Sequence, residues 1–169
     1  MFPNEDHKTF YSLLGLLSAS FAKMEYRLSQ ILSYLIGGEH EVIRETVISN
    51  NKLHDNINLI KKINAYREIE PELINGLMIK IKSISEERNL FIHGIWHEPH
   101  EKDGQIICLC ESKRIRHQVQ KKELGGEYSR WLRNEFHSYS IKSFEKRIRE
   151  VGQIIKIQDE LLQKLKMMS

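Results

Sequence analysis

Apolar residues recur at steps of three and four along four long segments of this 169-residue chain. The segments span about residues 6–36, about residues 50–66, a stretch from Pro71 toward Pro99, and the region after Ser140. This period gathers apolar side chains on one side of an α-helix, and that side must be buried. The pattern predicts a mainly α-helical, up-and-down bundle of four or five helices, with residues 39–47 adding a short helix.

Glycine, proline and serine mark the expected ends of these helices. Gly37-Gly38 ends the first helix, and Pro71 suits the first turn of the third. Pro99 is expected to stop the third helix, and Ser140 to be the N-cap of the last. The length suits one domain, residues 1–169, with enough chain for a core without disulfides or metal.

The pattern changes from helical to alternating at about residues 104–122. Residues 105–111 are apolar, Ser112-Lys113 resembles a turn, and residues 114–120 alternate. We expect a small β-hairpin inserted before the last helix, followed by an aromatic, polar linker. Cys108 and Cys110, the only cysteines, are too close for an ordinary disulfide and are expected to be small buried residues.

Composition excludes several classes of protein. No apolar run approaches the roughly 20 residues of a membrane span, and residues 1–6 lack the order of a signal peptide. With no disulfide framework either, we expect a reduced, cytoplasmic protein that is not bound to membranes. The formal charge of +3 gives no nucleic-acid signal by itself, so the distribution of charge has to carry that argument.

Three polar residues, Arg88, Asn89 and His93, lie near the end of the third helix. Successive helical residues are about 100° apart, so Arg88 falls within the apolar stripe. A guanidinium keeps its charge and needs a partner there, and Glu25, which borders the stripe of the first helix, is the expected one. Asn89 and His93 are four residues apart and share a neighbouring face.

The order Arg88-Asn89-x-x-x-His93-Gly94 resembles the R-x4-H motif of HEPN domains, small helical proteins of which many are metal-independent ribonucleases. The match covers about ten residues, and the expected helical bundle agrees with it. The resemblance implies that Arg88 binds and stabilises phosphate, that His93 is the acid–base group and that Asn89 supports both. It also implies a homodimer with one composite site, and a bacterial toxin–antitoxin or anti-phage setting with a cognate antitoxin or regulatory protein.

The chemistry of such a site needs no metal or other cofactor. RNA carries its own nucleophile, the 2′-hydroxyl, and histidine suits both proton transfers near neutral pH. Arginine offers a permanent charge and forked donors for the phosphate. One chain supplies one motif histidine, so two-histidine catalysis would require the dimer. A second helix face with Met78, Asn89, Ile92 and Trp96 also predicts a two-fold axis near the end of this helix.

Basic residues gather after the motif and interleave with aromatic ones, a pattern typical of binding to single-stranded RNA such as mRNA or to tRNA. The alternative is a solvated hairpin edge, on which lysine and arginine discourage strand pairing. The candidate RNA-binding residues are His97, Lys113, Arg114, Arg116, Arg130, Trp131 and Arg133.

Other interpretations of the same residues stay open. Arg88 can be a structural arginine, with His93 favoured by the helix dipole. His93, His97 and His100 form a histidine cluster, but no cysteine joins them and the H-E-x-x-H order is absent, so no metal is expected. The whole chain can also be a non-catalytic RNA- or nucleotide-binding module, or a helical dimerisation module.

Overall fold

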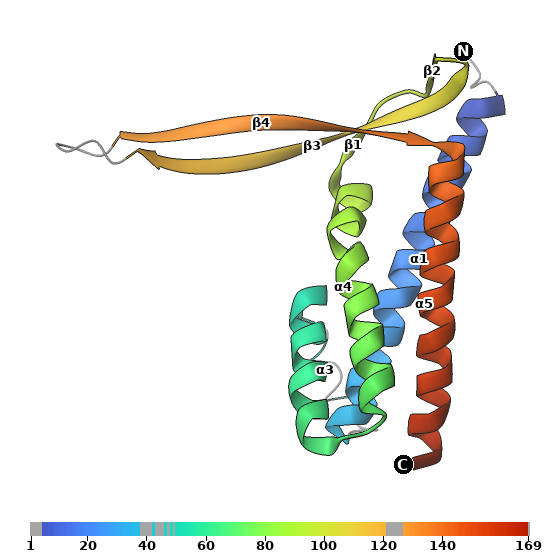
Figure 1. The fold of residues 1–169 in the computed structure, drawn as a ribbon, viewed down its shortest axis with the longest axis vertical. Helices are drawn as coiled ribbons and strands as arrows, with labels where there is room; N and C mark the ends of the chain where they lie inside the picture. Colours follow the sequence, from blue (N-terminus) through green and yellow to red (C-terminus); the bar gives the residue numbers. More distant parts are fainter. Residues whose placement is uncertain are drawn as a thin grey trace.

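The structure, a computed structural model, describes residues 5–37, 42, 46, 48, 50–120 and 127–168; for residues 113–120 and 127–134 it describes the backbone only. The described part is mainly helical, with an antiparallel sheet at one end (Figure 1). The helices are α1 (Glu5–Ile36), α3 (Leu53–Arg67), α4 (Pro71–His93) and α5 (Ile141–Met168). The strands are β1 (Ile95–Trp96), β2 (His100–Lys102), β3 (Gln105–Gln120) and β4 (Glu127–Ser140).

Helices α1 and α5 lie side by side, with α4 against both and α3 against α1 and α4 (Figure 1). Helices α1 and α5 both run away from the sheet, whereas α4 runs toward it. Because only residues 68–70 join α3 to α4, α3 runs away from the sheet as well. The bundle therefore has three helices in one direction and one in the other, and the expected strict up-and-down order is wrong.

The core lies between α1 and the other helices. Phe21, Met24 and Leu28 of α1 are fully buried, as is Leu161 of α5. Gln158, the polar residue that interrupts the apolar stripe of α5, is fully buried too, and its Nε2 donates to the carbonyl oxygen of Met24 at 2.9 Å. A cross-helix hydrogen bond thus partly compensates for the polar residue in the stripe.

Most of the predicted helix ends are confirmed. Helix α1 ends at Ile36, where Gly37 takes a φ of +83°, and Pro71 occupies the first turn of α4. The Ser140 hydroxyl accepts the backbone N–H of Ser143 at 3.3 Å, which is the predicted N-cap of α5. The short helix expected at residues 39–47 falls almost entirely outside the described residues.

The predicted end of α4 is wrong. The helix stops at His93 rather than continuing to Pro99, and Ile95–Trp96 forms β1. The reason is the crossing of β3: a Cβ added at Gly94 would lie 2.2 Å from the Cys110 sulfur and 2.5 Å from the Leu90 carbonyl oxygen. Glycine permits this close approach of strand and helix end, and the chain turns into the sheet.

The expected hairpin is present but is much larger than residues 104–122. Strand β3 continues through Ser112-Lys113 without a turn, and β4 occupies the stretch expected to be a linker. The register runs from Ile107 opposite Ser140 to Gln120 opposite Glu127. Strands β1 and β2 pair with the first part of β3 only, so the outer hairpin, residues 113–134, projects from the bundle (Figure 1).

The outer hairpin explains why β4 was missed. A strand that projects from the bundle has no continuous buried face, so its residues do not need to alternate between apolar and polar. The polar, charged sequence of β4 therefore gave little strand signal.

Candidate functional site at the end of α4

An aromatic cluster fixes the sheet onto the helices. Phe91, Trp96, Tyr139 and Phe144 pack with ring centroids 5.0–5.8 Å apart. The Trp96 indole N–H donates to the Phe91 carbonyl oxygen at 3.1 Å. Burial, with a smaller contribution from the nearby Glu87, raises the pKa of the Tyr139 hydroxyl, so this ring stays neutral. The cluster holds β1 and β4 rigidly against the ends of α4 and α5.

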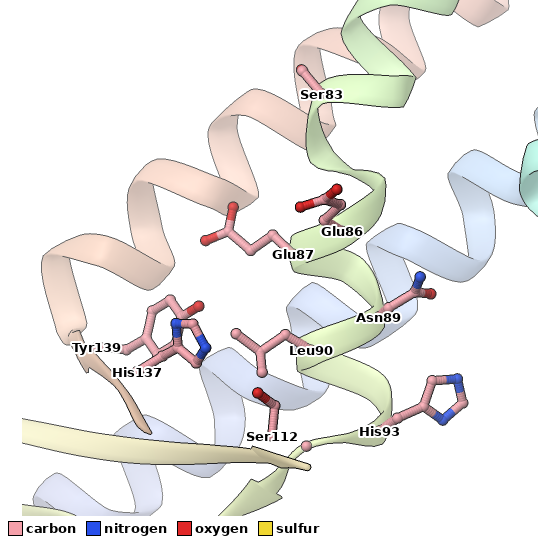
Figure 2. A pocket seen from close by; sticks show the side chains of 10 residues that line it. Ser83, Glu86, Glu87, Asn89, Leu90, His93, Ser112, His137 and Tyr139 are labelled. Atoms are coloured by element: carbon pink, nitrogen blue, oxygen red, sulfur yellow. The ribbon is translucent and has the colours of Figure 1, made fainter. Parts of the chain in front are cut away.

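A cavity of about 700 Å³ opens beside this cluster, between the last turns of α4 and the strands β3 and β4 (Figure 2). Asn89 and His93, two of the three motif residues, line it from α4. Both are exposed and lie on the same side of the helix, while Leu90 separates them from the strand side. The complete lining is Ser83, Glu86, Glu87, Asn89, Leu90, His93, Gly94, Ser112, His137 and Tyr139.

Arg88 does not line the cavity. Its Nε and Nη2 donate to the two carboxylate oxygens of Glu25 at 2.5 and 2.9 Å, and the two side chains are 19% and 29% exposed. The ion pair with Glu25 expected from the sequence is therefore present. Nη1 donates to Oδ1 of Asn89 at 2.9 Å, so Arg88 reaches the cavity only through that amide.

The cavity carries little positive charge. No lysine or arginine is found among the ten residues that line it in the described part of the chain. Glu87 is paired with Arg147, whose Nε lies 2.7 Å from its carboxylate, and Glu86 is exposed. A phosphate in this cavity would have to be neutralised by cations from outside it.

His137 is a cavity residue that sequence reasoning missed. It comes from β4, where it is opposite Cys110 and half-buried. Recognising β4 as a strand would have identified it, because residues two apart in a strand share a face and Tyr139 is buried against the helices.

His97 lies away from the cavity. Its Nε2 is 3.2 Å from a carboxylate oxygen of Glu111, and its ring packs against Phe136 at 5.9 Å. The preceding residue, Trp96, packs onto the bundle, so His97 belongs to the opposite face of the sheet.

The remaining candidate RNA-binding residues all belong to the outer hairpin. The register places Arg114 opposite Arg133 and Arg116 opposite Trp131. The side chains of Lys113, Arg114, Arg116, Arg130, Trp131 and Arg133 lie outside the described part of the structure. Their strand positions bring them together on one arm.

The two cysteines are structural. Cys108 and Cys110 are buried and unbridged, as expected. Burial, followed by the neighbouring Cys108, raises the pKa of the Cys110 thiol to about 11, which makes it a poor nucleophile. Among the described residues, no group of three or more His, Cys, Asp or Glu side chains is arranged to hold a metal ion.

The second face expected on α4 is only partly present. Met78 is fully buried within the chain, and Trp96 belongs to the aromatic cluster in β1. Ile92, 40% exposed, and Asn89 remain accessible on α4. The apolar surface that motivated a two-fold axis there is therefore smaller than predicted.

Comparisons of the chain with protein-family models, with curated proteins and with solved structures gave no match. No helix in the described ranges has the length and apolarity to cross a membrane. The argument for function accordingly rests on the cavity, its residues and the short motif that contributes two of them.

Proposed function

We propose that this protein is a metal-independent endoribonuclease of the HEPN type, acting on single-stranded RNA or tRNA. The observation that carries the proposal is the position of Asn89 and His93, which line one cavity at the end of α4. Motif residues that served only to pack the helix would not need open space in front of them. Histidine beside such a space is available for proton transfer to a bound nucleotide.

The hydrogen bond between Arg88 and Asn89 gives each residue a distinct role. Because the Asn89 Oδ1 accepts from Arg88, its amide N–H groups are the part left to meet a ligand. A phosphate oxygen is a suitable acceptor for them. Arg88 is then a positioning residue that fixes the orientation of this amide while anchoring α4 to Glu25 on α1.

The outer hairpin supports nucleic acid as the substrate. Residues 113–134 contain seven lysines and arginines and two glutamates, a formal charge of +5, against +3 for the whole chain. The rest of the protein is therefore slightly acidic, and the hairpin is where a polyanion would be attracted. In this proposal the hairpin supplies the cations that the cavity lacks.

A non-catalytic RNA-binding module is the second candidate, and one observation favours it. Arg88 is committed to Glu25, and the described cavity lining contains no lysine or arginine. Charge stabilisation of a pentavalent phosphate inside the cavity would then be weak. RNA could bind the hairpin without being cleaved.

The resemblance alone adds the biological setting to the proposal. It suggests a homodimer, a cognate antitoxin or other regulatory protein, and a role in a bacterial toxin–antitoxin or anti-phage system. Light scattering on the purified protein tests the dimer, and a monomer at tens of micromolar would remove it from the proposal.

The decisive experiment incubates the protein with labelled single-stranded RNA and with tRNA in EDTA. His93→Ala is the test variant, and His100→Ala is its matched control, since His100 is exposed on β2 of the same sheet and outside the cavity. We expect the wild type and His100→Ala to leave a 2′,3′-cyclic phosphate, His93→Ala to bind without cleaving, and a 2′-deoxy substrate to resist.

Other outcomes separate the candidates. Binding without cleavage by all three proteins supports the second candidate, and no binding by any of them rejects both. Cleavage that requires added magnesium or manganese rejects the metal-independent mechanism.

A further inference from the structure

The cavity contains two imidazoles from one chain. His93 comes from the last turn of α4 and His137 from β4, and both line the same space (Figure 2). The volume of about 700 Å³ lies within the range of pockets that bind small organic ligands, which a single nucleotide would fill.

The strand that carries His137 is firmly anchored. Two residues further on, Tyr139 packs into the aromatic cluster, and its ring lies 5.8 Å from Phe144 of α5. On the other side His137 is opposite Cys110, the residue whose sulfur sits against Gly94 at the end of α4. The two histidines are therefore held by packed elements that meet at Gly94, and their spacing is set by the fold.

Neither imidazole is occupied by the protein itself. The described side chains provide no hydrogen-bond partner for the ring nitrogens of His93 or His137. The other histidines of the folded core differ, since His97 is bound to Glu111 at 3.2 Å and His54 to Asn58 at 2.9 Å. Two unpartnered imidazoles beside one open space are suited to a ligand that exchanges protons.

We propose that His137 is the second proton-transfer residue of the ribonuclease site, so that one chain supplies both the acid and the base. This inference rests on the proposed function. It removes the need for a dimer to supply the second histidine, because His137 takes the place that a partner's motif histidine would fill.

The reaction balances with these two groups. One imidazole, neutral at the start, takes the proton of the 2′-hydroxyl, whose oxygen then bonds to phosphorus. The bond from phosphorus to the 5′-oxygen breaks, and the other imidazole, protonated at the start, gives its proton to that oxygen. The products are a 2′,3′-cyclic phosphate and a free 5′-hydroxyl, and exchange with water restores both protonation states.

The first test compares His93→Ala, His137→Gln and the control His100→Ala over a range of pH. We expect a bell-shaped rate profile for the wild type and the control. His137→Gln should lose about 10²–10⁴ of the rate and one limb of the profile. A uridine 3′-(4-nitrophenyl phosphate), whose leaving group departs without a proton, should restore activity to the variant that lacks the acid and not to the variant that lacks the base.

The second test uses the wild type and needs no activity. The imidazole signals of the isotope-labelled protein are followed by NMR while a 2′-deoxy oligonucleotide, which cannot be cleaved by this route, is added. The His93 and His137 signals should shift together, with the same dependence on oligonucleotide concentration, and the His100 signal should stay unchanged.

The outcomes distinguish the two proposals. A wild type that cleaves no RNA overturns the proposed function, and the catalytic role of His137 with it. An active wild type with a fully active, folded His137→Gln variant overturns the role of His137 alone. So does an active wild type in which the oligonucleotide shifts His93 and leaves His137 unmoved.

Discussion

Polar groups in the helical bundle are paired, whereas those at the sheet end face open space. Arg88 is locked to Glu25 between α4 and α1, and Gln158 is bonded to α1. By contrast, His93 and His137 line a cavity at the sheet end. The boundary runs through the motif itself, because a rotation of about 100° separates Arg88 from Asn89 on one helix. Neighbouring residues of one motif thus serve different ends, the first the fold and the second the site.

The difference predicts that substitutions at the sheet end change activity and that substitutions in the bundle change stability. The largest expected effect is that of His93→Ala on activity. Removing an acid–base group should lower cleavage by about 10²–10⁴-fold. Since His93 is exposed, the free energy of unfolding should change by no more than about 0.5 kcal/mol. Initial rates and urea unfolding on the same sample measure both, with His100→Ala as the reference. An equal loss of stability and activity would break the comparison.

Gly94 stands at the boundary, so Gly94→Ala should affect both properties. The added Cβ would overlap the Cys110 sulfur and the Leu90 carbonyl oxygen, which should lower the free energy of unfolding by about 1–3 kcal/mol and displace β3 from α4. Cleavage should fall with it, because the cavity lies between those elements.

Two variants sharpen this test. Gly94→Ala with Cys110→Ala should recover part of the stability, since the sulfur is one of the two obstacles. Gly76→Ala, in the same helix with nothing within 4 Å of the added Cβ, should be neutral or stabilise by up to about 1 kcal/mol. Urea unfolding curves give all three values, and a Gly94→Ala variant as stable as Gly76→Ala would contradict the close packing of β3 on α4.

Glu25→Ala should act on the bundle side. It leaves the half-buried Arg88 without its carboxylate, and we expect a loss of about 1–3 kcal/mol in the free energy of unfolding. The double variant Arg88→Met with Glu25→Leu should be more stable than Glu25→Ala, because no charge is then left unpaired. Rates corrected for the folded fraction should fall less than tenfold, through the loosened Asn89 amide. Glu145→Ala, exposed on α5, is the control, and a Glu25→Ala loss as large as that of His93→Ala would place Arg88 in the chemistry.

Features set by neighbouring residues in the sequence were predictable. The helices follow from apolar residues three and four apart, and their ends from local signals such as Pro71 and the Ser140 cap. The partner of Arg88 was predictable too, since a permanent charge in an apolar stripe requires an acid on the facing helix.

Features set by contacts between distant segments were not predictable. Helix α4 ends early because β3 crosses it at Gly94, which no residue near Pro99 signals. Strand β4 was taken for a linker because much of it pairs only with β3. His137 was lost with that strand, and so was half of the histidine pair that lines the cavity.

High pH should weaken the sheet end before the bundle. Burial raises the pKa of the Cys110 thiol from 9.0 to about 11, so the folded state holds this proton more tightly than the unfolded state. The resulting stability is fully present below pH 9 and is lost as the pH rises through 11, a change on the order of 2 kcal/mol. Urea unfolding of the wild type and Cys110→Ala at pH 8, 9.5 and 11 isolates this contribution. A constant difference between the two proteins across that range would show that the thiol does not titrate with folding.

The smallest effect is expected from Gln158→Met, which places an apolar side chain of similar length in the α1–α5 seam. The Gln158 Oε1 is buried with no partner in the described structure, while Nε2 donates to a Met24 carbonyl inside a helix. That carbonyl already accepts the helical N–H four residues on, so removing the amide leaves no new unpaired group. The free energy of unfolding should therefore stay level or rise by up to about 1 kcal/mol, with cleavage unchanged. Gln153→Met, exposed on the same helix, controls for helix propensity. A loss of more than about 1 kcal/mol, or cleavage that falls with it, would mean that this amide fixes how α5 sits on α1, and that bundle and site are coupled through the aromatic cluster.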